Sequence, residues 1–542
     1  MFITSHKHCM LFNSYVFIFA FLPVVFFGFY AIGRYSHNLA LLWLTFASLF
    51  FYGWWDIRFV GLLLGSIIFN YGAGYLIGQS LSKSTGSTKW LLVSAIVANM
   101  ILLGYFKYAN FFIENLNHLA GTALLIGEVF LPLGISFFTF TQIAYLVDTY
   151  QGKVKEYSFI HYTVFVTYFP HLIAGPVLHH KEMMPQFAKP DTCLINLENV
   201  AVGLSVFVLG LAKKVLIADS MGDMATPIFD AVTAGGQPML FESWVGALAY
   251  TLQLYFDFSG YSDMAIGLSL MFNVRLPMNF NSPYKATSII EFWRRWHMTL
   301  SRFLRDYLYI PLGGSRHGKG RRYVNLIVTM LLGGLWHGAG WTFVVWGGLH
   351  GSYLMINHAW RNLKQRMGWS DGGRWSNVGA GALTFLAVVV GWVFFRADSF
   401  SSAISMLQGM VAMNGVSVHQ SFAKFVAVFT QKLHIEISLK GFTPLSLVKI
   451  NFGMLQILIG LCLVFFFPNA CQIMQRFRPT LEDMKDSVPI NFEPNVPTQT
   501  KLLRLMEWCP TKLQGAFYGV LFFILLAYMA SASKSEFLYF QF

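Results

Sequence analysis

Apolar segments long enough to cross a lipid bilayer recur along almost the whole chain, and they constrain its fold more than any other feature. A spanning helix needs about 20 mostly apolar residues. We therefore predict an all-α, polytopic integral membrane protein with about eleven to thirteen membrane segments, some re-entrant or tilted because glycine or proline interrupts them. The expected segments are 14–33, 39–55, 59–78, 90–108, 124–147, 158–178, 199–218, 241–256, 323–337, 341–357, 378–396, 451–468 and 514–532.

Composition supports a membrane protein and argues against a nucleic-acid binder. Hydrophobic residues make up 55% of the chain and charged residues 12%, with a mean hydropathy of +0.53. A soluble domain would carry about a quarter charged residues. The net charge of +13 fits cytoplasmic loops of a membrane protein better than a phosphate-tracking surface, which needs a solvent-exposed basic face.

The chain reads as one membrane-embedded domain over residues 10–542. Met10 is a candidate start, because it leads directly into the first apolar run, and no small-residue cleavage site follows that run. The five cysteines form no CxxC pair, so we expect neither disulfides nor a metal site, and no tightly bound cofactor. The adjacent pair His179–His180 is interpreted as loop polarity, and 471–512 as a polar surface loop.

One stretch, 279–322, is strongly basic, with nine lysines and arginines against Glu291 and Asp306. Lysine and arginine near membrane ends bias a segment toward the cytoplasm. We expect this stretch to form a cytoplasmic-side amphipathic segment, with 359–376 on the same side.

Asp257 and Asp263 fall in an apolar neighbourhood, where each carboxylate needs a partner or water. Two interpretations are open. The carboxylates satisfy a broken helix or pair with the arginines of 294–305, or they form a polar wall of a substrate tunnel.

Residues 291–306 have the pattern of an amphipathic helix that carries His297. Two ion pairs are expected at i,i+4 spacing, Glu291 with Arg295 and Arg302 with Asp306. By pattern alone His297 is as readily a structural histidine as a functional one. The neighbouring arginines suit an anionic ligand such as a nucleotide phosphate. These candidate ligands are Arg294, Arg295, Arg302 and Arg305.

His337 follows Trp336 at the end of an apolar run and lies among four glycines. Close helix packing explains the glycines but not the histidine. An ionisable group at membrane depth is a functional candidate, and neutral imidazole is a common general base near neutral pH. We therefore take His337 as a catalytic candidate, with Trp336 beside it in the substrate site. A GxSxG elbow, an HExxH helix and a P-loop are absent from the sequence.

These motifs together resemble the membrane-bound O-acyltransferase (MBOAT) family, and within it the alginate O-acetyltransferase branch. Peptidoglycan O-acetyltransferases and the teichoic-acid D-alanyl transfer protein are relatives within that resemblance. It covers nearly all the chain from Met10. The segments that carry it are DFSGYSD at 257–263, FWRRWH at 292–297, RDYLYIPLGG at 305–314, GLWHG at 334–338, GYFKYAN at 104–110, LPLGISF at 131–137, FPHLIAGP at 169–176, WVFFRAD at 392–398 and FQF at 540–542.

The resemblance implies helices around a central tunnel, with His337 as the central active-site histidine and His297 as the second motif histidine. It implies a multi-pass protein of the bacterial cytoplasmic (inner) membrane. Such a protein takes acetyl from a cytoplasmic thioester, here expected to be acetyl-CoA, toward hydroxyls of an extracytoplasmic polysaccharide. Alginate, cellulose and peptidoglycan all remain open as the polymer. The expected partner is an extracytoplasmic SGNH-type acetyltransferase or a polysaccharide-synthesis complex.

In the expected mechanism, His337 takes the proton of an acceptor hydroxyl as that hydroxyl attacks the thioester. His297 polarises the carbonyl or orients the donor. Direct transfer is favoured, since no covalent nucleophile stands out. Two other classes of function remain: a transporter of polysaccharide or acyl donor, and a non-catalytic scaffold of a synthesis complex.

A cysteine placed at Lys319 tests the expected orientation. Because 279–322 is strongly basic, this cysteine should react with an impermeant maleimide only after the cells are opened. Labelling from outside intact cells would reverse the topology and move the donor entrance to the other face.

Overall fold

Helices make up the architecture throughout the described part of this computed structural model, and these residues contain no β-strand. The structure describes residues 10–83, 87–125, 127, 129–154, 158–173, 175–369, 372–416, 447–481, 503–531 and 537–538. The helices are η1 Phe17–Phe21, α1 Leu22–Gly33, α2 His37–Gly53, α3 Arg58–Ser82, α4 Thr88–Ala120, α5 Ile135–Tyr150, α6 Phe159–Thr167, α7 Phe169–Leu172, α8 His180–Phe187, η2 Pro190–Cys193, α9 Leu197–Ala212, η3 Lys213–Ala218, α10 Asp219–Thr233, α11 Leu240–Met271, η4 Pro283–Lys285, α12 Ile289–Arg295, α13 Met298–Leu304, η5 Arg305–Tyr309, α14 Gly318–His337, α15 Trp341–Arg366, α16 Arg374–Arg396, α17 Phe400–Met410, α19 Leu447–Phe466, α20 Ala470–Ile473, η7 Gln475–Phe477 and α22 Lys512–Ser531.

Several of these helices are long and apolar enough to cross a membrane, which makes the chain a multi-pass membrane protein. Within the described residues, five helical stretches meet both requirements: Arg58–Ser82, Thr88–Ala120, Leu197–Thr233, Arg374–Arg396 and Lys512–Ser531. Shorter apolar helices cover Phe17–Gly33 and Gly453–Phe466. The total of eleven to thirteen membrane segments stays a prediction.

Two of the expected segments are not continuous helices. The segment 124–147 becomes helical only from Ile135, because Gly134 adopts a left-handed conformation with φ of 70°. The segment 158–178 is divided into α6 and α7 at Tyr168, two residues before Pro170. A proline restricts the residues around it, so the break has a local cause.

Helix α11 is the longest buried element and continues well past the expected end at residue 256, through Asp257 and Asp263. It packs against α9 and η3 with the backbones in close contact, because paired glycines face each other at two levels. Gly203 lies against Gly267, and Gly210 lies against Gly260. Small residues at matched positions allow this approach.

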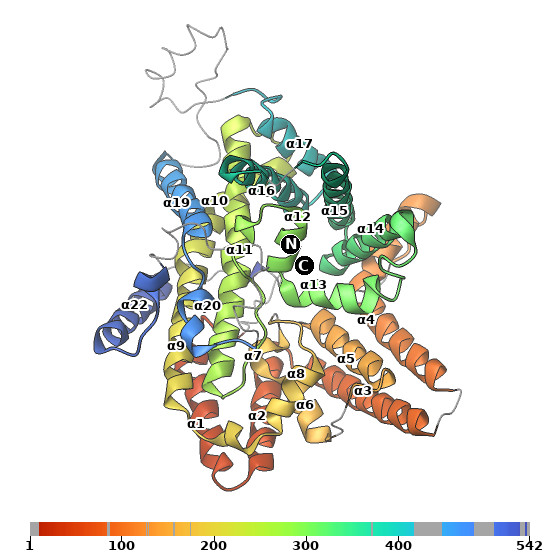
Figure 1. Ribbon diagram of the computed structural model, residues 1–542, viewed down its shortest axis with the longest axis vertical. Coiled ribbons are helices and arrows are strands. Elements are labelled where there is room, and N and C mark those ends of the chain that lie inside the picture. The colour runs from red at the N-terminus through yellow and green to blue at the C-terminus, as the bar shows by residue number, and fades with distance from the viewer. Residues whose placement is uncertain are drawn as a thin grey trace.

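The short helices α12 and α13 lie in the middle of the molecule, between α11 on one side and α14 and α15 on the other (Figure 1). The single amphipathic helix expected over 291–306 is wrong, because the chain breaks between them. Trp296 is extended, and His297 is left-handed at φ 43° and ψ 53°. This break turns the His297 side chain into the interior, where it is fully buried.

The first residues of the expected polar loop 471–512 form two short helices. Residues 470–473 form α20 and 475–477 form η7, whereas 482–502 lie outside the described residues. Asn469 caps α20 and also donates to Asn281 and Ser282, so this segment is tied to the centre of the molecule.

Replacing Gly267 by alanine should lower the thermal stability of the purified protein. A Cβ at Gly267 would meet the carbonyl oxygen of Gly203, which is backbone and cannot move aside. Overpacking of this kind costs about 1–3 kcal/mol. Gly65→Ala is the control, because a Cβ at that helical glycine meets nothing within 4 Å. Equal melting temperatures for the two variants in detergent would contradict the close α9–α11 contact.

Candidate active site

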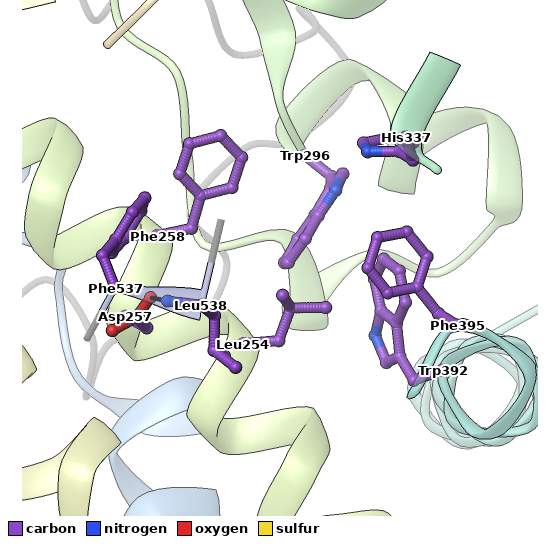
Figure 2. A pocket seen from close by; sticks show the side chains of 9 residues that line it. All are labelled: Leu254, Asp257, Phe258, Trp296, His337, Trp392, Phe395, Phe537 and Leu538. Atoms are coloured by element: carbon purple, nitrogen blue, oxygen red, sulfur yellow. Dashed lines mark hydrogen bonds between the residues drawn. The ribbon is translucent and has the colours of Figure 1, made fainter. Parts of the chain in front are cut away.

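His337 is the last residue of α14 and lines a cavity in the interior of the protein (Figure 2). Helix α14 ends at the same residue as the expected segment 323–337. The glycines before it allow α14 to press against α15, since a Cβ at Gly334 would overlap the backbone of Phe343 and Gly347. The cavity is otherwise almost wholly apolar and is lined by Leu254, Asp257, Phe258, Trp296, His337, Trp392, Phe395, Phe537 and Leu538.

His297 joins His337 in this site, although the two residues come from different helices. Their ring centroids lie 6.5 Å apart, and both side chains are almost inaccessible, at 0% and 5% exposure. Burial lowers the pKa of His297 to about 3, so its imidazole is neutral at physiological pH. His297 Nε2 and His337 Nδ1 are both buried and have no hydrogen-bond partner among the described residues.

Aromatic rings enclose the two histidines on several sides. His337 contacts Trp346 and Phe395 at centroid distances of 5.1 Å. The ring centroid of Trp336 lies 4.9 Å from that of His337 and 6.2 Å from that of His297. Trp336 itself stacks on Phe140. Such an apolar environment strengthens the electrostatic interactions inside it.

The two aspartates are paired with lysines, and the expected pairing with the arginines of 294–305 is wrong. Lys213 bonds Asp263 at 2.5 Å, and Lys214 lies 2.7 Å from both Asp257 and Asp219. The lysines belong to η3, far from the basic stretch in sequence. Asp257 lines the cavity and accepts a hydrogen bond from the Leu538 amide (Figure 2). Asp263 is not among the lining residues.

Three of the four candidate arginines are occupied by carboxylates. The pair of Arg295 with Glu291 is confirmed at 2.7 Å. The expected pair of Arg302 with Asp306 is wrong, because Arg302 forms a bidentate pair with Glu182 at 2.8 Å.

Asp306 instead pairs with the adjacent Arg305, at 2.7 Å. Arg294 is exposed, and no ion pair is recorded for it in the described part of the chain. Of the four arginines it is therefore the most available to an incoming anion.

His179 and His180 are buried at the start of α8 and do not form a polar loop, which corrects the sequence interpretation. His179 Nδ1 lies 3.1 Å from the hydroxyl of Tyr307, which donates to Asp148. His180 lies 3.4 Å from the same carboxylate. Within the described residues, no group of three or more histidine, cysteine or acidic side chains is arranged to hold a metal ion.

Sequence reasoning missed Lys107, which holds the helix end that carries His337. The Lys107 ammonium on α4 donates to the carbonyl of Trp336 and, at 3.2 Å, to that of His337. The neighbouring Tyr108 donates to the carbonyl of Leu335 at 2.9 Å. Cations at a helix C-terminus stabilise its unpaired carbonyls. The signal was present, because Lys107 is a charge within an apolar segment, like the aspartates that were singled out.

His350 was also missed. It is fully buried on α15, accepts a hydrogen bond from the Trp293 indole at 3.2 Å, and lies 4.8 Å from Trp346 between ring centroids. Trp346 separates it from His337, so it supports the aromatic wall of the site.

Comparison with known proteins shows the family to which this chain belongs. Residues 88–397 match the model of the membrane-bound O-acyltransferase family. This chain belongs to that family. The matched region contains both histidines, Lys107 and the four arginines.

The relatives of this O-acyltransferase include proteins named for peptidoglycan, alginate and teichoic acid. A peptidoglycan O-acetyltransferase of Helicobacter pylori is 45% identical over 436 residues, which cover 76% of this chain and 81% of that protein. A probable alginate O-acetylase of Pseudomonas aeruginosa is 44% identical over 406 residues, covering 74% and 75%. A teichoic acid D-alanyltransferase of Streptococcus thermophilus is 32% identical over 247 residues, covering 43% and 58%.

Lys107→Met should reduce acyl transfer by this acyltransferase while leaving it folded. Methionine keeps much of the side-chain volume but donates no hydrogen bond to the end of α14, and misplacing a catalytic group by about 1 Å costs roughly 10²-fold in rate. Lys89→Met, an exposed change on the same helix, should behave as wild type. Unchanged turnover in a stable Lys107→Met protein would remove this lysine from the site.

Proposed function

We propose that this acyltransferase moves an acetyl group from acetyl-CoA, on the cytoplasmic side, to hydroxyls that lead to an extracytoplasmic polysaccharide. The observation that carries the proposal is the pair of buried histidines enclosed by aromatic side chains. His337 is the one that lines the cavity. Acetyl is the group named for the relatives that match most of this chain, whereas the D-alanyl relative matches less than half of it.

In the proposed reaction the hydroxyl oxygen attacks the thioester carbonyl carbon, and the carbon–sulfur bond breaks. His337 takes the proton from the hydroxyl and returns it to the sulfur, so that the donor leaves as a thiol. Transfer is direct, with no acyl-enzyme. No serine, threonine or cysteine is among the described residues that line the cavity, and its apolar walls keep out bulk water, which would compete with the hydroxyl for the thioester.

The donor is proposed to enter beside the basic stretch 279–322. Arg294 is the residue best placed to attract its phosphates, since Arg295, Arg302 and Arg305 already hold carboxylates. Binding of the donor phosphates by those three arginines would require exchange of a carboxylate for a phosphate, which costs part of the binding energy.

We place the enzyme in the bacterial inner membrane, with a partner of the SGNH acetyltransferase type outside it. Acetyl-CoA is a cytoplasmic thioester and envelope polysaccharides are assembled outside, so the acetyl group has to cross the bilayer. The peptidoglycan and alginate enzymes among the relatives support a polysaccharide of this class as the final acceptor.

His337→Ala should abolish polymer acetylation while membrane insertion and abundance stay near normal. Loss of a general base lowers the rate by roughly 10²- to 10⁴-fold. The assay is alkali-released acetate from purified envelope polysaccharide, with transfer from labelled acetyl-CoA by the purified protein as the second measurement. His118→Ala, an exposed histidine of α4, is the control. A well-expressed His337→Ala protein that still acetylates would eliminate this mechanism and favour a transporter or scaffold.

A further inference from the structure

Asn279 is the centre of the hydrogen bonds that hold the break between α12 and α13. Its backbone carbonyl accepts the amide hydrogen of Met298 at 2.9 Å. Its side-chain oxygen accepts from the Thr299 hydroxyl at 2.9 Å and from the Thr299 amide at 3.4 Å. The same oxygen lies 3.1 Å from His297 Nδ1. One fully buried residue therefore supports three successive residues of the loop.

The orientation of the Asn279 amide is determined by its neighbours. A backbone N–H is always a donor, so the Thr299 amide requires the carbonyl oxygen of Asn279 and not its NH₂ group. The Thr299 hydroxyl accepts from the Val177 amide at 3.0 Å, which leaves its own hydrogen for Asn279. The Asn279 NH₂ group points to the Ser262 hydroxyl at 3.4 Å.

This orientation determines the tautomer of His297. A carbonyl oxygen can only accept, so His297 Nδ1 must carry the hydrogen. Because the buried ring is neutral, Nε2 then has a lone pair and no hydrogen. His297 therefore accepts a hydrogen bond at Nε2 and cannot donate one to a thioester carbonyl. Polarisation of the carbonyl by His297 does not fit this geometry.

Two buried ring nitrogens have no hydrogen-bond partner among the described residues. His297 Nε2 is an acceptor, and His337 Nδ1 belongs to the ring that lines the cavity. The two ring centroids lie 6.5 Å apart, and one water can bond to both rings across this separation when these two nitrogens face each other.

We propose that Asn279 is a positioning residue of the transfer reaction: through His297 and a bridging water it holds His337 with Nδ1 protonated and Nε2 free to act as the base. The water donates to His297 Nε2 and accepts from His337 Nδ1–H. When His337 Nε2 takes the hydroxyl proton, the imidazolium keeps this hydrogen bond and its charge is stabilised. The inference rests on the proposed function, in which His337 is the base.

Nitrogen NMR of protein labelled with ¹⁵N-histidine reads the tautomers without any assay of activity. The signals of the two residues are assigned by their loss in His297→Ala and His337→Ala. Both residues should show a protonated Nδ1 and an unprotonated Nε2. In Asn279→Leu the His297 signals should move toward a tautomer mixture. A wild-type His297 with a protonated Nε2 would overturn the proposal.

A double-mutant cycle separates positioning through His297 from a general structural role. Asn279→Leu should lower kcat by roughly 10²-fold, with little change in the KM for acetyl-CoA. In a His297→Ala background the same change should cost no more than about twofold, because the path through His297 is already lost. Equal losses in both backgrounds would show that Asn279 acts on the fold alone and would overturn the proposal.

Two further variants keep the test decisive if Asn279→Leu folds poorly. Asn279→Asp keeps an acceptor for His297 and Thr299, so it should retain much more activity than the leucine variant. Ser262→Ala removes only the partner of the NH₂ group and should match wild type. Full activity in a stable Asn279→Leu protein contradicts the proposal. If His337→Ala is active, the proposed function fails first; if it is inactive and the cycle is additive, only this inference fails.

Discussion

Lys214 lies between Asp257 and Asp219 at the level where η3 meets α11, and Lys213 pairs with Asp263 about two turns further along α11. Removing one partner of a buried pair costs about 3–5 kcal/mol, because it strands the remaining charge in a low dielectric. Because both carboxylates have charged partners, α11 continues past Asp257 and Asp263 as a single helix. They also fix Asp257, which lines the cavity and accepts the amide hydrogen of Leu538.

The centre of the protein depends on the same requirement that buried polar groups find partners. The backbone breaks at His297, and groups released by the break are bonded again by the segment 279–281. Asn279 accepts from Met298 and Thr299, and the Asn281 amide donates to the Arg295 carbonyl. Irregular backbone is tolerated in the interior of a membrane protein only where other protein groups satisfy it. The left-handed conformation of His297 is thus held by its surroundings, as strained residues at functional sites generally are.

The candidate active site combines an apolar aromatic wall with a small number of fixed polar groups. Trp346 and Phe395 pack against His337, and Lys107 holds the backbone of the same residue from α4. Polar groups held in place by such a wall need little reorganisation when charge develops. The charged arginines lie on the short helices α12 and α13 and on η5, where they balance acidic residues and leave Arg294 exposed.

Sequence alone determined the features that depend on local pattern. Apolar length predicted the membrane helices, an ionisable residue at the end of an apolar run identified His337, and i,i+4 spacing predicted the pair of Glu291 with Arg295. Tertiary structure decided which distant groups meet. Arg302 pairs with Glu182, Asp263 with Lys213 and Asp257 with Lys214. A buried charge pairs with the opposite charge that packing brings near it, whatever its position in the sequence. The break at His297 could not be read from the pattern of 291–306, because Asn279, eighteen residues earlier, supplies the hydrogen bonds that make it stable.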